Sequence, residues 1–253
     1  MIEATTVDPR PLTVLYRDEH VVAIDKPAGL QVHRSRISAE DSDFVLQRLR
    51  DQIGQLLYPV HRLDRPTSGV LLFALNPDAA RALTAQFQAR SPRRRYLAIV
   101  RGYTELEGRI ERPLRNAPDK PARDAVTCYR RLATVELPYA VSRYPTSRYS
   151  LVDVRLHTGR HHQIRRHFNH ISHPVIGDTT YGQGAHNRLF REEFAIHRLL
   201  LHAHYLRVQH PVTEQPLIVS APLPPEFERL IDRFGWHHVR QELADDWNCN
   251  CNE

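Results

Sequence analysis

Apolar residues along this chain follow two different periods, and the period changes several times. Short runs rich in apolar and β-branched residues predict strands, some of them joined as hairpins. These runs cover residues 12–16, 21–24, 58–63, 70–75, 96–100, 125–137, 149–156, 199–208 and 217–219. Because the strands do not alternate regularly with helices, the pattern favours an α+β fold with a mixed, mostly antiparallel central sheet and flanking helices.

Four other segments repeat their apolar residues every three or four positions and predict amphipathic helices. These segments are residues 42–53, 77–89, 160–171 and 225–234. Asn76 and Thr158 are predicted to cap the second and third helices, and Gly54 to end the first. Arg165 lies about 100° around the third helix from the apolar Ile164, so its side chain is expected at the edge of the core.

The length of 253 residues is close to the upper limit for one hydrophobic core, and no internal repeat divides the chain. We expect one domain over residues 12–236, with terminal extensions at 1–11 and 237–253 and a polar tail that frays after Trp236. The start of the chain does not resemble a secretory signal, and the three cysteines form no disulfide framework. The longest apolar run, residues 70–75, is too short to span a membrane. These features indicate a cytoplasmic protein.

The charge of the chain points to a kind of partner. Lysine and arginine outnumber aspartate and glutamate by six, and the sequence pI is about 9.5. Lys26 and Lys120 are the only lysines, so arginine carries almost all of the positive charge. Arginine pairs with phosphate in a bidentate way and stacks on bases, which favours a nucleic-acid partner over a membrane. An arginine-rich proteome would give the same composition, and composition alone leaves both explanations open.

Three segments contain residues that suit chemistry. In His61–Gly69 the carboxylate of Asp64 stands where a strand enters a turn and can face a cleft, although such residues also simply favour turns. In Thr158–His167 a helix start and its arginines suit phosphate, or form a solvated helix face. In Arg93–Val100 a basic run precedes Tyr96, which suits contact with nucleic acid or is an ordinary strand. Pattern alone leaves these alternatives open.

Together with an earlier turn, these segments resemble a known family. Motifs of the RluA-type pseudouridine synthases are matched in order by Lys26–Gly29, His61–Gly69, Arg94–Tyr96 and Gly159–Arg165. The similarity covers about residues 12–236, and His61–Gly69 is its most specific part. One departure is His161, where the family usually has threonine, and this difference bears mainly on substrate contacts.

Within this family the chain is most similar to the branch that modifies uridine 65 of tRNA. The segments that carry this similarity are Asp51–Gly54, Arg143–Tyr149 and Phe234–Trp236. The resemblance implies the pseudouridine synthase catalytic fold and a cofactor-free isomerisation, in which the N–C glycosidic bond of a uridine breaks, the base rotates and a C–C bond rejoins it. Asp64 is the implied catalytic carboxylate, which attacks the ribose or the base or stabilises charge at the sugar.

The resemblance also implies roles for residues around Asp64. Arg165 is implied to pair with the carboxylate, and Tyr96 to pack on the target base and move a proton. A base inside a stem must be flipped out to react, and Arg62 is implied to fill the vacated stack. Further substrate-binding residues are expected to be His61, Arg65, Thr67, Arg160 and Gln163.

Other functions remain as alternatives. A sister enzyme that acts on ribosomal RNA is excluded by no local motif, and a non-catalytic RNA-binding module would need the arginines but no ionised Asp64. A zinc enzyme is disfavoured because the histidines clustered at 161–173 lack a ligand pattern such as HExxH or paired CxxC. We therefore expect an RNA partner, no metal, no cofactor and, since no spare apolar stripe is evident, a monomer.

Overall fold

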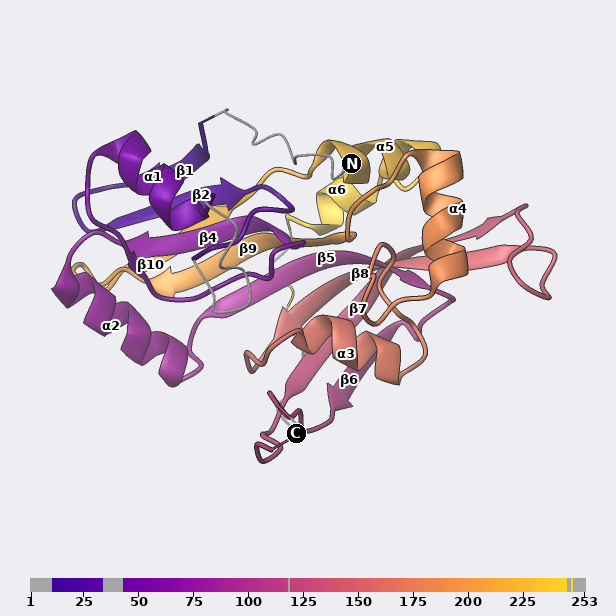
Figure 1. The fold of residues 1–253 in the computed structure, drawn as a ribbon, viewed down its shortest axis with the longest axis horizontal. Helices are drawn as coiled ribbons and strands as arrows, with labels where there is room; N and C mark the ends of the chain where they lie inside the picture. Colours follow the sequence, from indigo (N-terminus) through magenta and orange to yellow (C-terminus); the bar gives the residue numbers. More distant parts are fainter. Residues whose placement is uncertain (1–10, 34–42, 118, 245–246, 248–253) are drawn as a thin grey trace, which may run out of the picture.

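A single mixed sheet forms the centre of the computed structural model, which describes residues 11–33, 43–117, 119–244 and 247 (Figure 1). Its strands are β1 (Thr13–Arg17), β2 (Val21–Lys26), β3 (Tyr58–Pro59), β4 (Ser68–Ala74), β5 (Arg93–Arg101), β6 (Glu107–Glu111), β7 (Val126–Leu137), β8 (Ser147–Leu156), β9 (Leu201–Gln209) and β10 (Pro216–Ser220). Their order across the sheet is β1-β2-β4-β9-β5-β8-β7-β6, with β10 beside β9 and β3 beside β4. Among these pairs only β4 and β9 run parallel. The predicted α+β fold with a mostly antiparallel sheet is confirmed.

Helices cover both faces of this sheet. They are α1 (Val45–Ile53), α2 (Pro77–Gln88), α3 (Gln163–His170), α4 (Gly184–Phe194), α5 (Pro225–Arg233) and α6 (Val239–Glu242). Alternate residues of β5 point to opposite faces, so Tyr96 and Ala98 join the core under α1 and α3, whereas Leu97 and Ile99 join the core under α4 and α5. A third core cluster lies between α2 and strands β2, β4, β9 and β10. Tyr96 and α3 therefore share one face of the sheet.

Two helix ends follow the local chemistry of the sequence. α2 begins at Pro77, directly after Asn76, whose side chain accepts a hydrogen bond from the amide of Ala79. α1 ends before Gly54, which adopts the left-handed conformation with φ of 68°. The predicted cap and stop are both confirmed.

The third helix starts later than predicted, and Thr158 does not cap it. α3 begins at Gln163, directly after His162, which has a left-handed φ of 54°. The Thr158 hydroxyl donates to the side-chain carbonyl of Gln163 and accepts from the amide of Val126. Residues 159–162 thus form a tight turn in place of the predicted first helical turn.

The predicted strand over residues 58–63 is wrong beyond its first two residues, which form β3. Past that point, Nε2 of the His61 ring accepts a hydrogen bond from the amide of Leu72 in β4 at 3.0 Å. The His61 side chain therefore accepts the hydrogen bond from the Leu72 amide. In a longer β3, a backbone carbonyl would accept it instead. The following residues are left to form a loop.

Two elements had too weak an apolar pattern to be predicted. α4 buries His186 and Asn187 beside Phe190, so polar residues occupy part of its inner face. β6 lies at the edge of the sheet, and Ile110 is its one fully buried residue. Buried polar residues in α4 and the edge position of β6 both obscure the regular spacing of apolar residues from which helices and strands are predicted.

The chain after Trp236 does not fray as predicted over the residues described there. α6 packs against β7, and its Val239 is fully buried. Trp247 is buried as well, and the guanidinium of Arg130 lies 5.2 Å from the centroid of its ring. The rest of the predicted extensions lies outside the described residues, and the domain boundaries stay predictions.

Gly69 lies where β4 and β9 run side by side. Its φ is 111°, and a Cβ at this position would lie 2.2 Å from the carbonyl oxygen of Ala203. On the neighbouring pair, the Ser68 hydroxyl hydrogen-bonds Nδ1 of His202 at 2.8 Å and accepts from Nη2 of Arg198 at 2.6 Å. Only a residue without a side chain permits this close approach.

Gly69→Ala is expected to lower the free energy of unfolding by about 3 kcal/mol or more, because backbone strain and overlap with Ala203 both oppose the new methyl group. Gly54→Ala is the matched control, because its φ is also positive but no atom lies within 4 Å of the added Cβ. It is expected to cost about 1 kcal/mol. Urea denaturation followed by circular dichroism measures both, and equal losses would contradict the importance of the Ala203 contact.

Candidate active site

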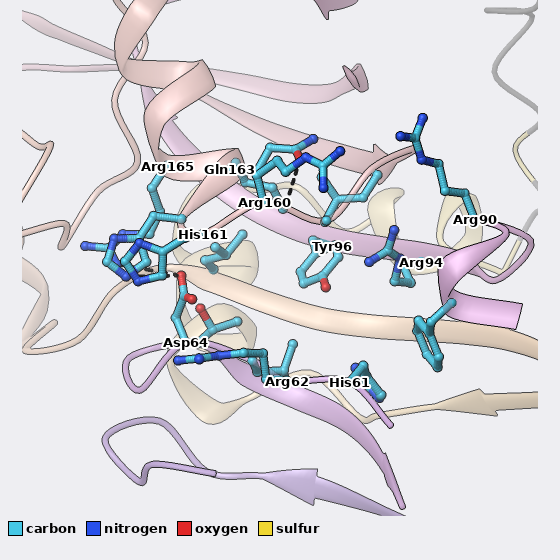
Figure 2. A pocket seen from close by; sticks show the side chains of 18 of the residues that line it. His61, Arg62, Asp64, Arg90, Arg94, Tyr96, Arg160, His161, Gln163 and Arg165 are labelled. Carbon is cyan, nitrogen blue, oxygen red and sulfur yellow. Dashed lines mark hydrogen bonds and ion pairs between the residues drawn. The ribbon is translucent and has the colours of Figure 1, made fainter. Parts of the chain in front are cut away.

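A cavity of about 620 Å³ opens on the face of the sheet that carries Tyr96 and α3 (Figure 2). The loop between β3 and β4 contributes Asp64, β5 contributes Tyr96, and α3 contributes Arg165. β9 separates β4 from β5, and Leu201 at its start forms part of the wall between them. Three residues distant in sequence thus line one space, whose size is typical of a small-molecule or nucleotide pocket.

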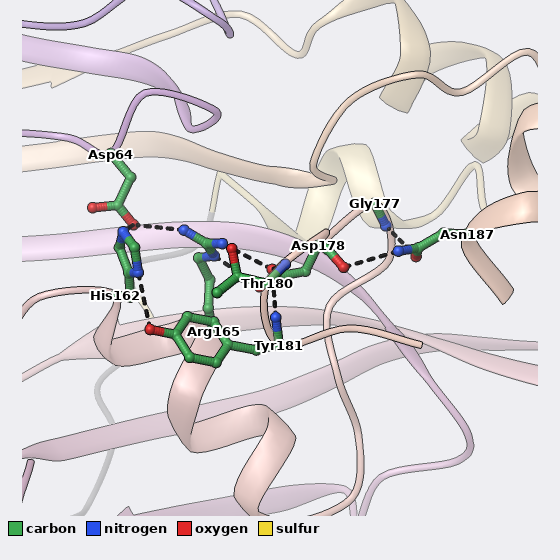
Figure 3. A network of polar contacts seen from close by, with 8 residues as sticks. All are labelled: Asp64, His162, Arg165, Gly177, Asp178, Thr180, Tyr181 and Asn187. Carbon is green, nitrogen blue, oxygen red and sulfur yellow. Dashed lines mark hydrogen bonds and ion pairs between the residues drawn. The ribbon is translucent and has the colours of Figure 1, made fainter. Parts of the chain in front are cut away.

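Asp64 lies in the loop between β3 and β4. Its side chain is 19% exposed, and Oδ2 lies 3.7 Å from Nη1 of Arg165 and 3.9 Å from Nε2 of His162 (Figure 3). Both distances exceed a hydrogen bond, so these groups attract the carboxylate by charge and dipole and leave it available to a ligand. The backbone amide of Thr67 donates to the carbonyl of Asp64 at 3.0 Å and closes the turn.

A buried carboxylate that sequence reasoning missed holds Arg165. The Arg165 side chain is 4% exposed, as expected at the core's edge, and its Nε and Nη2 donate to the two carboxylate oxygens of Asp178 at 2.7 and 2.8 Å. The amides of Thr180 and Tyr181 donate to the same carboxylate. Burial alone would raise the pKa of Asp178, but these donors, Arg165 foremost, hold it below its usual value. This pairing directs the remaining Nη1 toward Asp64.

His162 links Asp64 to the loop that follows α3. Burial lowers the pKa of His162 to about 4 in spite of the nearby Asp64, so the ring is neutral near pH 7. Its Nδ1 lies 3.1 Å from the hydroxyl of Tyr181. When that hydroxyl donates to Nδ1, the N–H of the neutral ring is at Nε2 and faces Asp64. His161, the departure from the family motif, stacks on His162 with ring centroids 3.6 Å apart.

Tyr96 lies in the middle of the cavity, between Asp64 and Arg94 in Figure 2. Burial raises its pKa above the usual value, with Arg94 acting in the opposite direction, so the phenol stays protonated near pH 7. Thr67 also lines the cavity, and its buried hydroxyl oxygen has no hydrogen-bond partner among the described residues. A flat ring and an unsatisfied hydroxyl are groups that a planar polar ligand can use.

Lys26 anchors the loop that carries Asp64. Its side chain is fully buried, and Nζ donates to the backbone carbonyls of Pro27, Leu30 and Arg65 at 2.7, 2.8 and 3.2 Å. All three N–H donors of the ammonium group are therefore satisfied, although burial lowers the pKa of Lys26 to about 7. This amine ties the turn after β2 to the residue next to Asp64.

Three arginines expected to bind substrate are placed differently. Arg62 is exposed and lines the cavity, and Arg160 also lines it while its Nε donates to the carbonyl of Asp124. Arg65 is not among the lining residues, and its Nε donates to the carbonyl of Gly29 at 2.9 Å. The loop directs Arg65 toward the turn after β2, which does not support its expected contact with substrate.

Gln163 lines the cavity, and the protein also uses its side chain to position the turn before α3. Its Oε1 accepts hydrogen bonds from Oγ1 of Thr158 and the amide of Arg160. Its Nε2 donates to the carbonyl of Val126 and to Oγ1 of Thr127. Since the protein already occupies all four hydrogen-bonding positions of the amide group, Gln163 fixes the turn before α3 against β7.

His61 is likewise engaged by the protein, although it lines the cavity. Its ring stacks on Phe87 with centroids 4.8 Å apart, and Nε2 accepts from Leu72 as described above. Burial, with help from Arg94, lowers the pKa of His61 to about 3. The ring therefore forms a neutral wall near pH 7.

Asp178, Tyr181 and Arg90 are among the lining or supporting residues to which sequence reasoning gave no role. A signal for Asp178 was present, because an arginine expected at the core's edge requires a buried carboxylate nearby. Nothing in the sequence indicated which carboxylate this is. Its identity depends on the fold of the loop between α3 and α4.

Histidines near the cavity are engaged in other ways than metal binding. His167 hydrogen-bonds Oγ1 of Thr127 through Nδ1, and Nδ1 of His173 lies 2.7 Å from the carbonyl oxygen of Arg101. Within the part of the chain that the structure describes, no three His, Cys, Asp or Glu side chains are grouped to hold a metal ion. Cys249 and Cys251 lie outside that part.

Comparison with known proteins decides the family. The sequence profile described as RNA pseudouridylate synthase matches residues 20–170. The chain belongs to this family. Its relatives include tRNA pseudouridine synthase C of Vibrio vulnificus, 47% identical over 235 residues, which cover 89% of this chain and 96% of the relative. The corresponding protein of Vibrio cholerae is 48% identical over the same length and the same shares of both chains. Among solved structures, human RNA pseudouridylate synthase domain containing 1 matches with a TM-score of 0.66, at 27% identity and with 84% of each chain covered.

The pseudouridine synthase profile ends before the residue that holds Arg165 in place. Asp64, Tyr96 and Arg165 lie inside the matched segment, whereas Asp178 lies beyond its end. The contact that orients Arg165 is therefore known here from the structure rather than from the profile.

Asp178→Asn is expected to lower RNA turnover about a hundredfold with little change in KM, because Arg165 loses the contact that aims it at Asp64. The matched control is Asp153→Asn, which breaks another buried pair, with Arg95 at 2.5 Å, on the opposite face of the sheet. Each change should destabilise the fold, but only Asp178→Asn should lower kcat per folded molecule. Equal kcat losses would show that stability alone accounts for the effect.

His61 should also make stability depend on pH. Its unfolded pKa is near 6.5 and its folded pKa is about 3, so on acidification the unfolded state takes up a proton that the folded state does not. Stability is therefore lost as pH falls through 6.5. Between pH 7.5 and 5.5, His61→Gln should lose about 1 kcal/mol less unfolding free energy than the unsubstituted protein. Urea titrations at the two pH values measure this, and parallel losses would contradict it.

Proposed function

We propose that this chain isomerises a single uridine of tRNA, at position 65, to pseudouridine. Asp64 carries the proposal, because it is the one carboxylate among the cavity-lining residues and lies beside the oriented Arg165. The similarity to proteins named tRNA pseudouridine synthase C supports tRNA as the substrate.

The reaction conserves every atom of the nucleoside, so the enzyme has to provide a reactive carboxylate and a space in which uracil can turn. Asp64 is the proposed catalytic carboxylate, and the Arg165 guanidinium favours its ionised form. The fixed positions of Asp178 and Arg165 mean that little reorganisation is needed as charge changes at Asp64. The neutral His162 adds a dipole on the same side.

The uracil must leave its helical stack to reach Asp64, at a cost of a few kcal/mol. Tyr96, Ile164 and Leu201 give the cavity apolar surface on which a base can pack. Arg62, exposed at the cavity, is the proposed residue that fills the vacated stack, since a guanidinium plane stacks on bases.

None of the three segments that resemble the tRNA branch lines the cavity. Trp236 is 3% exposed, packs with Phe234 in the core and donates from Nε1 to the carbonyl of Thr134. Of the β7–β8 connection, Tyr144 is exposed beside Arg143. The substrate preference is therefore proposed to come from the shape of the whole RNA, with the β7–β8 connection as the exposed candidate contact.

Tritium release from uracil-labelled RNA tests the substrate. Transfer RNA should release label from one position, and ribosomal RNA fragments should be poor substrates at matched salt. Charge attracts any RNA equally, so matched salt isolates the contribution of shape. Faster release from ribosomal RNA would favour the sister enzyme and overturn the tRNA assignment.

Asp64→Asn is expected to abolish turnover while tRNA affinity stays within a few-fold, because phosphate contacts supply most of the affinity. Measurements of tritium release and of tRNA binding on the same preparation separate the two effects. Asp153→Asn serves again as the control for a carboxylate lost outside the cavity. Turnover by the Asp64→Asn protein would favour a different catalytic group, and an unsubstituted protein that binds tRNA but releases no label would favour a non-catalytic RNA-binding module.

We also propose that the enzyme acts as a monomer in the cytoplasm. Among the described residues, no helix is long and apolar enough to cross a membrane. Light scattering at working concentrations tests the oligomeric state.

A further inference from the structure

Besides Arg62 and Arg165, three arginines line the cavity, and Figure 2 shows two of them, Arg94 and Arg90, beyond Tyr96 as seen from Asp64. Arg94, Arg90 and Arg160 all line the cavity, and Figure 2 shows Tyr96 between Asp64 and Arg94. We call Arg90, Arg94 and Arg160 the distal arginines. The cavity-lining residues include no carboxylate besides Asp64, so none of them neutralises this group directly.

Arg94 is held in place without a counter-charge. Its guanidinium lies 6.0 Å from the centroid of the Phe87 ring, and its Nη1 lies 2.8 Å from where a Cβ on Gly159 would be. A glycine at 159 therefore leaves the space that the guanidinium occupies. The Nε atom is buried and has no hydrogen-bond partner among the described residues, and none of their carboxylates forms an ion pair with Arg94.

Two buried arginines and the half-buried Arg198 each have a carboxylate partner. Arg95, the next residue in β5, pairs with Asp153, and Arg165 pairs with Asp178. Arg198 lies 3.7 Å from Glu226. Arg94 is half-buried like Arg198, but its guanidinium lines the cavity with no carboxylate of the described residues beside it, which favours an anionic partner from outside the protein.

The surroundings of Arg94 add positive charge. Burial lowers the pKa of Arg94, and no carboxylate acts against this effect. The pKa of Arg160 is lowered by burial and then by repulsion from Arg90 and Arg123, which together outweigh the opposite effect of Asp124. The nearby His61 is neutral near pH 7, as shown above. An anion placed among the distal arginines would relieve this repulsion, and guanidinium groups match the geometry of phosphate.

We propose that the distal arginines form a phosphate subsite that takes one backbone phosphate of the RNA strand beside the extruded uridine. This inference rests on the proposed function for the identity of the RNA, but not for the presence of the anion site. Tyr96 then separates two parts of the cavity: the base lies on the Asp64 side, and the backbone phosphate on the Arg94 side. Arg94 is the central contact because its guanidinium is already ordered before the RNA arrives.

The first experiment uses inorganic phosphate as the probe and needs no turnover. Phosphate, compared with chloride at matched ionic strength, should raise the melting temperature of the unsubstituted protein but not that of Arg94→Met. Arg81→Met is the control, because it removes one positive charge from an exposed pair with Asp78 on α2, outside the cavity. It should respond to phosphate as the unsubstituted protein does.

The melting temperatures in chloride separate a binding role from a structural one. Arg94→Met keeps the apolar stem and removes a half-buried charge that has no carboxylate partner, so it should melt no lower than the unsubstituted protein. A clearly lower melting temperature would assign Arg94 to structural packing and overturn the proposal. An equal phosphate response in the Arg94→Met protein would overturn it as well.

The second experiment locates the phosphate on the RNA. Substrate RNAs each carry one uncharged methylphosphonate linkage near the target uridine, and affinity is measured in the Asp64→Asn background. One linkage should weaken binding about tenfold, and Arg94→Met should be insensitive to that same linkage. If the loss of affinity caused by Arg94→Met adds to the loss caused by each neutral linkage, Arg94 does not contact any of these phosphates.

The outcomes also distinguish this inference from the proposed function. If tRNA is not isomerised by the unsubstituted protein but the phosphate response depends on Arg94, the proposed function fails and the anion site remains. If tRNA is isomerised while neither experiment shows dependence on Arg94, the anion site fails and the proposed function remains.

Discussion

The parallel contact between β4 and β9 is the constraint on which this structure depends. It joins β1-β2-β4 to β9-β5-β8-β7-β6, and its register comprises only the pairs Ser68–His202 and Gly69–Ala203. Asp64 comes from the loop that enters β4, whereas Tyr96 and Arg165 belong to the other group of strands and its helix. The relative position of the carboxylate and the arginine is therefore set by how closely these two strands approach. Glycine at 69 and the hydrogen bonds of Ser68 fix that approach.

A chain of buried polar contacts carries this order to the cavity. Nζ of Lys26 donates to the carbonyl of Arg65, the residue after Asp64. This hydrogen bond fixes the backbone conformation of the loop that enters β4. On the other side, Asp178 fixes Arg165, and Gln163 fixes the turn that precedes it. Because every donor in these contacts has a near acceptor, both walls are formed before any ligand binds.

The sequence was sufficient for the parts of the fold that follow local rules. Strand runs, the Asn76 cap and the Gly54 stop are properties of neighbouring residues, and the structure contains them. The start of α3 depends on a contact between segments that are distant in sequence. The Thr158 hydroxyl hydrogen-bonds the Gln163 side chain and the amide of Val126 in β7, so it does not cap the helix. Motif similarity named Asp64, Tyr96 and Arg165, which line one cavity, but it did not indicate the contacts that Gln163 and Arg65 make within the protein. Which distant side chains form hydrogen bonds with each other is decided by the folded chain, and no pattern of neighbouring residues in the sequence indicates it.

The same β4–β9 contact has a consequence for how the protein forms. Ser68 and His202 are 134 residues apart in sequence, so a large loop must close before the two walls of the cavity meet. Pairing of β1 with β2 is local and can form early, as can the β7–β8 hairpin. Insertion of β9 between β4 and β5 has high contact order and is expected to be slow. During synthesis the ribosome must extrude β9 before Asp64 and Arg165 can face each other. A growing chain can therefore expose its arginines to RNA before it has assembled a cavity that could act on a uridine.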